Sequence, residues 1–154
     1  MVPGTVLLVN DIDNFEIPKN LSDDVRNQLI DRKRALQLSY DPAGKTLQIE
    51  EGISAVKIER GFNRQLIRDP NPAYDYIDSG DWGVIEIKGP LPENGKGSLT
   101  GLANKIIKEL MDSSQIFDTM VVDTANLTPA QIDELKQLIS GAVAATTKKI
   151  KYVS

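Results

Sequence analysis

The chain has 154 residues, of which 40% are hydrophobic and 26% are charged, and its formal net charge is -4. That length and composition predict one compact globular domain, long enough to bury a core. The sequence contains neither cysteine nor histidine, which excludes disulfides, thiol nucleophiles, zinc sites built on Cys or His, and mechanisms that need an imidazole. Any chemistry must therefore come from carboxylates, lysine, arginine, hydroxyls, the backbone or a bound metal ion.

The charge and the apolar runs limit the partners. Because the net charge is negative, the chain has no overall attraction to a polyanion, and contacts with nucleic acid must be local. The longest apolar run near the start covers only residues 6–9, is far shorter than a membrane span and lacks the basic leader of a signal peptide. We therefore expect no membrane contact in the folded state.

The first forty residues are predicted to form a lead-in followed by one helix. The helix begins after Ser22, whose hydroxyl can cap it, and Asp23 and Asp24 favour its first turn. It ends before residues 41–44, whose sequence DPAG forms turns. We therefore divide the chain into an N-terminal lead-in and helix, residues 1–40, and an α/β domain, residues 41–154.

The middle of the chain is predicted to hold a second helix and a β-hairpin. The helix covers residues 46–60 and ends at Gly61, because glycine often follows a helix end. Its buried side is expected to carry Leu47, Ile49, Ile53 and Val56. Three strands are expected next, around residues 65–67, 73–78 and 82–88. The last two form a hairpin, since residues 79–81, SGD, are a turn signal.

The remaining third is predicted to alternate helix and strand. Six apolar residues at steps of three and four indicate an amphipathic helix, with Glu109 off the stripe: Leu99, Leu102, Ala103, Ile106, Ile107 and Leu110. A strand over residues 116–122 follows. Thr128, Pro129 and Gln131 then form the capping box of another helix, and residues 149–153 form a last strand. This order predicts an α/β fold with a central mixed β-sheet flanked by helices.

Three residues of the predicted hairpin have the chemistry of a metal site. Residues 84–88 alternate, so that Glu86 and Lys88 point to the same side of the strand. Asp75 precedes Glu86 by a distance in sequence that a short hairpin folds back, which brings the two carboxylates together. Carboxylate oxygens are ligands that Mg²⁺ prefers, and Lys88 beside them would orient or deprotonate a bound water or neutralise the transition state. A solvated Glu-Lys pair is the alternative.

These features resemble the PD-(D/E)xK nucleases, in which helices and strands surround an Asp, an acidic residue and a Lys. The closer resemblance is to the C-terminal toxin domains of bacterial polymorphic toxins, of the contact-dependent growth inhibition and Rhs type. It covers roughly residues 22–125. The residues that carry it are YDPAGK at 40–45, the helix with Glu51, Ala55, Ile58 and Glu59, LIR at 66–68, DYID at 75–78 and EIKGP at 86–90. It implies an α-β-β-α-β core with an extra C-terminal helix and strand.

The resemblance also implies roles for site residues. Asp75 and Glu86 would bind the metal ion, Lys88 would lie near the attacking water, and a helical glutamate would assist as a further ligand. Glu59 is the preferred glutamate, because it lies nearer the helix end that leads to Asp75, and Glu51 is the alternative.

The sequence departs from the family pattern at one position. The proline expected directly before the Asp is absent, since Tyr74 precedes Asp75 and the nearest proline is Pro72. Asp78 and Asp81 are rival ligands, although Asp81 is expected in the hairpin turn.

Basic and aromatic residues are candidate contacts for nucleic acid, with solvated surface as the alternative for the basic ones. Four basic residues gather around the end of the second helix: Lys57, Arg60, Arg64 and Arg68. A second basic group lies near the end of the chain, where the alternative is that lysines on an exposed terminal strand discourage edge pairing: Lys148, Lys149 and Lys151. Three aromatic residues flank the site and either stack on bases or fill the core: Tyr74, Tyr76 and Trp82.

The sequence thus predicts a metal-dependent nuclease that hydrolyses phosphodiester bonds of DNA or RNA, and the pattern does not distinguish the two substrates. Mg²⁺ is the expected ion, with Mn²⁺ and Zn²⁺ as alternatives. The resemblance implies an antibacterial toxin domain, delivered as part of a larger toxin, that acts in the cytoplasm of the target cell and is neutralised by an immunity protein. The alternative is a non-enzymatic α/β binding module, such as an immunity or adaptor protein.

Overall fold

The computed structural model describes residues 14–41, 46–68, 75–92 and 98–154. The chain divides into two compact units, Met1–Ala73 and Tyr74–Ser154. The boundary predicted after residue 40 lies inside the first unit. None of the helices in the described part of the chain has the length and apolar character needed to cross a bilayer.

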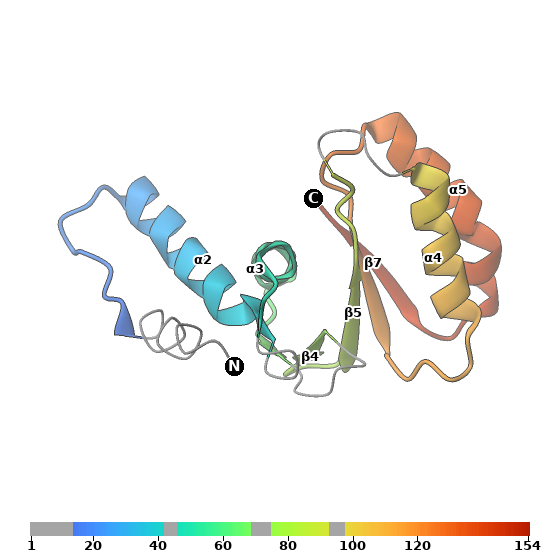
Figure 1. The fold of residues 1–154 in the computed structure, drawn as a ribbon, viewed down its shortest axis with the longest axis horizontal. Coiled ribbons are helices and arrows are strands. Elements are labelled where there is room, and N and C mark those ends of the chain that lie inside the picture. The colour runs from blue at the N-terminus through green and yellow to red at the C-terminus, as the bar shows by residue number, and fades with distance from the viewer. Residues whose placement is uncertain (1–13, 42–45, 69–74, 93–97) are drawn as a thin grey trace. The chain divides into compact units, whose positions relative to one another are not determined.

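The first unit is built on two helices, α2 (Asp23–Ser39) and α3 (Ile49–Phe62), which pack against each other (Figure 1). Two short strands, β1 (Tyr40–Asp41) and β2 (Thr46–Leu47), lie between the two helices in the sequence and pair with each other in antiparallel orientation. A third strand, β3 (Leu66–Arg68), follows α3. The helices approach closely at Gly52, where a Cβ would collide with the Ser39 hydroxyl and the Ala35 backbone oxygen of α2.

The predicted start of α2 is confirmed, because the Ser22 hydroxyl accepts a hydrogen bond from the Val25 backbone N–H at 3.4 Å. Three expectations for α3 are wrong. The helix begins at Ile49 and not at residue 46, because Thr46–Leu47 form strand β2. The helix continues past Gly61 and is capped by Asn63, which adopts the left-handed conformation (φ 53°) that Asn tolerates better than most residues. Ile49 and Ile53 are 50% and 45% exposed, since α3 turns its small residues, including Gly52, toward α2.

The second unit contains a mixed β-sheet with strand order β4-β5-β6-β7. Strands β4 (Tyr76–Asp78) and β5 (Val84–Lys88) form the predicted antiparallel hairpin, and β5, β6 (Thr119–Asp123) and β7 (Lys149–Val153) run parallel. The predicted α/β class with a mixed sheet is therefore confirmed.

Two helices connect the parallel strands of this sheet. Helix α4 (Leu99–Met111) links β5 to β6, and α5 (Pro129–Ala145) links β6 to β7. Both lie on the same face of the sheet and pack against each other (Figure 1). The core of the unit lies between them and the sheet and includes Ile106, Leu110, Met120, Leu135 and Ile139.

The predicted helix signals in this unit are confirmed. The apolar stripe of α4 is buried at Leu102, Ala103, Ile106 and Leu110, and α5 begins with the complete Thr128–Gln131 capping box. Strand β6 begins at Thr119, later than predicted, and Ile116 is 63% exposed in the preceding loop.

Candidate functional site

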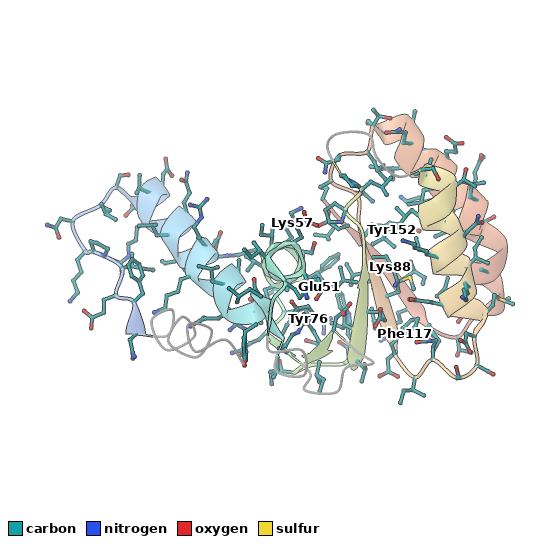
Figure 2. All side chains as sticks on the ribbon, in the orientation of Figure 1. Glu51, Lys57, Tyr76, Lys88, Phe117 and Tyr152 are labelled. Atoms are coloured by element: carbon teal, nitrogen blue, oxygen red, sulfur yellow. The ribbon has the colours of Figure 1, made fainter. Side chains whose placement is uncertain are left out.

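The alternation of β5 places Glu86 and Lys88 on the face of the sheet that carries α4. Val84, on the same face, packs against the core cluster formed with α4 and α5. Lys88, the last residue of β5, reaches toward α4 (Figure 2) and donates a hydrogen bond to Glu109 of that helix. The polar end of this strand therefore faces a covering helix and not open solvent.

Lys88 contacts two carboxylates directly. Its Nζ lies 2.6 Å from Glu109 Oε1 and 3.7 Å from Glu86 Oε2. The three side chains are largely buried, with exposed fractions of 19% for Lys88, 25% for Glu109 and 12% for Glu86. Ion pairs at this depth are screened less by solvent than surface pairs.

Asp75 belongs to the same group of residues. It immediately precedes β4. Tyr76 pairs with Ile85 in the antiparallel register, so the next position along each strand places Asp75 opposite Glu86. Its Oδ2 accepts a hydrogen bond from the Ile87 backbone N–H at 2.8 Å. We call Asp75, Glu86, Lys88 and Glu109 the Lys88 cluster.

The charges of the cluster act on Lys88. Burial lowers the pKa of its ammonium group, but the hydrogen bond and charge of Glu109, together with the charges of Glu86 and Asp75, raise it by more. The net shift is upward from the ordinary lysine pKa, so Lys88 stays protonated at neutral pH. Lys88 is therefore a fixed cation in this site.

The chain leaves the site through a position that requires glycine. Gly89, directly after Lys88, has φ +80°, which residues with a side chain rarely adopt. A Cβ there would collide with the backbone oxygen of Asp123, at the end of the adjacent β6. Gly89 thus lets the ends of β5 and β6 approach closely, and β5 ends at Lys88, directly before it.

The donors of the cluster suit a hard cation. Within the described residues, no three acidic side chains are arranged to hold a metal ion. Asp75 and Glu86 supply two carboxylates, and Mg²⁺ is commonly bound by one or two carboxylates while waters or phosphate oxygens complete its shell. The buried Glu109 Oε2 has no hydrogen-bond partner in the described part of the chain and can accept from such a water. The residues fit a partly hydrated ion.

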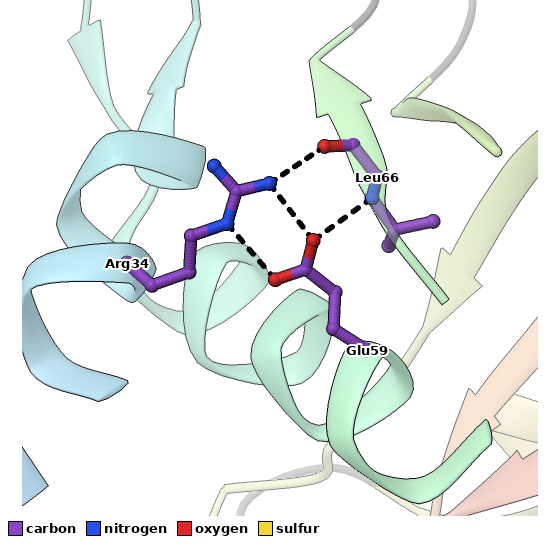
Figure 3. A network of polar contacts seen from close by, with 3 residues as sticks. All are labelled: Arg34, Glu59 and Leu66. Carbon is purple, nitrogen blue, oxygen red and sulfur yellow. Dashed lines mark hydrogen bonds and ion pairs between the residues drawn. The ribbon is translucent and has the colours of Figure 1, made fainter. Parts of the chain in front are cut away.

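The structure gives Glu59 well-defined partners within the first unit. Its two carboxylate oxygens accept hydrogen bonds from Arg34 Nε and Nη2 at 2.9 and 2.8 Å (Figure 3). Oε2 also accepts from the Leu66 backbone N–H at 2.8 Å, and Arg34 donates to the Leu66 carbonyl. This network connects α2, α3 and β3 and engages both oxygens of Glu59.

Glu51, the alternative helical glutamate, is also paired. Its Oε2 lies 2.7 Å from Arg68 Nη1, and the Arg68 side chain is 11% exposed. Arg68, a predicted contact for nucleic acid, therefore connects β3 to α3. A metal-binding role for either glutamate stays a prediction.

The other basic candidates of the first unit lie on or after α3. Arg60 forms an exposed ion pair with Asp31, and Lys57 is half-buried on α3. Arg60 and Arg64 line a groove of about 640 Å³ together with Lys33 and Arg34 of α2. This groove also contains Asp31 and Glu59, and it gives part of the predicted basic rim a concave surface.

The rival ligands and the aromatic residues have structural contacts. Asp78 is buried and accepts a hydrogen bond from the Trp82 backbone N–H at 3.1 Å, whereas Asp81 is exposed in the turn. Tyr76 and Trp82 are 0% and 4% exposed, so they belong to the core and cannot stack on bases in this conformation. Tyr74 lies outside the described residues.

The lysines at the C-terminus are not a uniform patch. Lys148 donates to the backbone oxygens of Gln115 and Phe117, both at 2.8 Å, and lies over the Phe117 ring. Lys149 pairs with exposed Asp81, and Lys151 lies 5.7 Å from the centre of the Trp82 ring. Lys148 therefore has a structural role that the charge pattern did not reveal.

Glu109 is the site residue that the sequence pattern missed. It was expected off the apolar stripe of α4, yet it follows buried Ile106 by three residues and precedes buried Leu110. No local pattern indicates this contact, because strand alternation does not show which face of the strand a helix covers.

The chain was also compared with known proteins. Comparison with family models, curated proteins and solved structures finds no match.

Proposed function

We propose that this protein is a metal-dependent nuclease whose active site is the Lys88 cluster. The observation that carries the proposal is the convergence of Asp75 and Glu86 on Lys88 at the end of β5. Two carboxylates and a lysine in this arrangement are the functional groups expected of a PD-(D/E)xK nuclease, which the sequence resembles. Their burial beside α4 argues against the solvated Glu-Lys pair considered as the alternative.

The residues divide the chemistry between them. Asp75 and Glu86 would hold the divalent ion, which when bound acidifies a coordinated water and stabilises negative charge on a phosphate. Lys88 stays protonated because of its carboxylate neighbours. In the proposed site Lys88 would neutralise charge that develops on a phosphate oxygen.

Glu59 is left out of the proposed metal ligands. Both of its oxygens accept hydrogen bonds from Arg34, and one also accepts from Leu66. A carboxylate engaged in this way would have to break an arginine pair in order to bind a cation. We therefore assign Glu59 to the stability of the first unit.

The groove of the first unit suits contact with the substrate backbone. Lys33, Arg34, Arg60 and Arg64 outnumber the acidic residues among its lining side chains. Local positive charge of this kind positions phosphates without reading sequence. This fits a nuclease whose net charge is negative.

The biological setting of the proposal rests on the sequence resemblance. A toxin domain of this kind would be delivered as part of a larger toxin, act in the cytoplasm of a target bacterium and be neutralised by an immunity protein. The corresponding test is expression in a bacterial host. The parent chain should arrest growth when produced in the cytoplasm, and Lys88→Met should not.

A cleavage assay tests the proposed activity. The purified parent, Lys88→Met and Lys105→Met are incubated with plasmid DNA, total RNA and tRNA, with Mg²⁺ or with a chelator. Lys105 is an exposed residue of α4 and serves as the control. We expect cleavage of one substrate class by the parent and by Lys105→Met, and loss of it with chelator or in Lys88→Met.

Two outcomes would contradict the proposal. Cleavage that survives both the chelator and the loss of Lys88 would place the activity elsewhere or trace it to a contaminant. A folded parent that cleaves none of the three substrates with Mg²⁺ or Mn²⁺ would favour the non-enzymatic binding module.

A further inference from the structure

We infer that Glu109 is a positioning residue of this active site, which holds the Lys88 ammonium group in place through Oε1. The inference rests on the proposed nuclease function and goes beyond it. Glu109 lies on α4, outside the segments whose sequence resembles that of the PD-(D/E)xK nucleases. Its basis is the direct contact between Glu109 and Lys88 and the way in which α4 is anchored.

Lys88 lies closer to Glu109 than to Glu86. Lys88 Nζ lies 2.6 Å from Glu109 Oε1 but 3.7 Å from Glu86 Oε2. A lysine side chain has four rotatable bonds and no fixed direction of its own. The shorter, charge-assisted hydrogen bond therefore selects the position of the ammonium group, and Glu86 contributes a weaker attraction at longer range.

Helix α4 gives Glu109 a rigid support. Ile106 is 0% exposed and Leu110 is 5% exposed, so the turn of α4 that carries Glu109 is packed into the core on both sides of it. A shift of Glu109 would require that turn to move against the sheet. The carboxylate therefore transmits the position of the helix to Lys88 at the end of β5.

The two oxygens of Glu109 have different surroundings. Oε1 accepts the hydrogen bond from Lys88, whereas the buried Oε2 has no hydrogen-bond partner in the described part of the chain. An unsatisfied buried carboxylate oxygen is costly to keep. The cost of this unsatisfied oxygen is consistent with a need for the charge of Glu109 to hold the lysine.

The experiment compares Glu109→Gln and Glu109→Asp with the parent. Glutamine keeps the shape but removes the charge, and aspartate keeps the charge on a shorter side chain. We expect kcat per folded molecule to fall by about 10- to 100-fold in Glu109→Gln, as for a misplaced catalytic group, with a smaller loss in Glu109→Asp. KM should stay within about twofold of the parent, and the affinity for Mn²⁺ should fall much less than in Glu86→Gln, because Glu109 is not proposed as a direct ligand of the ion or the substrate.

The control is Glu134→Gln, which removes an exposed carboxylate from α5 and should leave kcat unchanged. A folded Glu109→Gln with the parental kcat would overturn the inference. Loss of Mn²⁺ affinity in Glu109→Gln comparable to that in Glu86→Gln would also overturn it, since Glu109 would then be a ligand.

If Glu109→Gln does not fold, the inference is tested with the kcat of Glu109→Asp. A folded Glu109→Asp with the parental kcat then overturns the inference. Failure of the nuclease proposal gives a different result, namely no metal-dependent cleavage by the parent itself.

Discussion

The acidic residues of the two units are used differently. In the first unit Glu59 and Glu51 are each paired with an arginine, Arg34 and Arg68, at 2.7–2.9 Å. In the second unit three carboxylates act on a single lysine, Lys88. Glutamates that look equivalent in the sequence pattern therefore meet different electrostatic surroundings.

The geometry of the cations explains the difference. A guanidinium group is planar and matches a carboxylate with two parallel hydrogen bonds, as Arg34 does with Glu59. An ammonium group is a point charge that several carboxylates can approach at once. The first arrangement stabilises the contact between elements. The second keeps a cation and carboxylates close together, as phosphodiester chemistry requires.

Asp75→Asn should have the largest effect. Asparagine retains an oxygen that can accept the hydrogen bond from the Ile87 N–H, but it removes one of the two proposed metal-binding charges. Cleavage should fall by about 10²- to 10³-fold, the usual cost of removing one preorganised electrostatic group, while the melting temperature changes little. Single-turnover cleavage and thermal unfolding measure the two effects. If folded Asp75→Asn cleaves at the parental rate, the active site is not the Lys88 cluster of the second unit.

Gly89→Ala should have the next largest effect, because it forces a side chain into φ +80° and against the backbone oxygen of Asp123. We expect the free energy of unfolding to fall by about 1–3 kcal/mol, with a loss of cleavage as Lys88 moves. The control is Gly141→Ala, where a Cβ meets nothing within 4 Å in α5 and helix propensity should stabilise the protein by about 1 kcal/mol. Urea unfolding distinguishes the two, and equal stabilities would contradict the role given to Gly89.

Glu59→Gln tests the structural pairs of the first unit. It removes a charge that accepts hydrogen bonds from Arg34 and from the Leu66 N–H. The expected cost is about 1–3 kcal/mol of unfolding free energy. Asp31→Asn breaks the exposed pair with Arg60 and should cost less than about 1 kcal/mol. If the two variants lose the same stability, the Arg34–Glu59 network has no special role.

Lys148→Met should show the smallest effect that is still measurable. It removes hydrogen bonds to the Gln115 and Phe117 carbonyls, at an expected cost of about 1 kcal/mol. Lys149→Met removes an exposed ion pair with the Asp81 carboxylate at 3.7 Å and a long, exposed hydrogen bond to the Asp81 backbone oxygen at 3.4 Å. Its expected cost is about 0–0.5 kcal/mol. Chemical denaturation of both variants is the measurement, and a larger loss in Lys149→Met would reverse the assignment.

Much of the second unit was predictable from local patterns. The apolar stripe of α4, the Thr128–Gln131 capping box and the hairpin turn each depend on residues close in sequence. The same is true of Glu86 and Lys88, whose shared face follows from strand alternation. The α/β class and the mixed sheet followed from the order of these elements.

Contacts between distant residues could not be predicted. Glu59 meets Arg34 across 25 positions, and Lys88 meets Glu109 across 21. No local period indicates which face of β5 a helix covers, so Glu109 was left off the site. The burial of α3 was misjudged for a related reason, because the closeness allowed by Gly52 turned Ile53 outward.

The most direct test of the account compares Glu86→Gln with Glu59→Gln in one Mg²⁺-dependent cleavage assay, with the amount of folded protein measured for each. The account predicts that Glu86→Gln loses cleavage by about 10²-fold or more, and that folded Glu59→Gln cleaves at the parental rate. Parental cleavage by Glu86→Gln, or its loss in folded Glu59→Gln, would contradict the assignment of the active site to the Lys88 cluster.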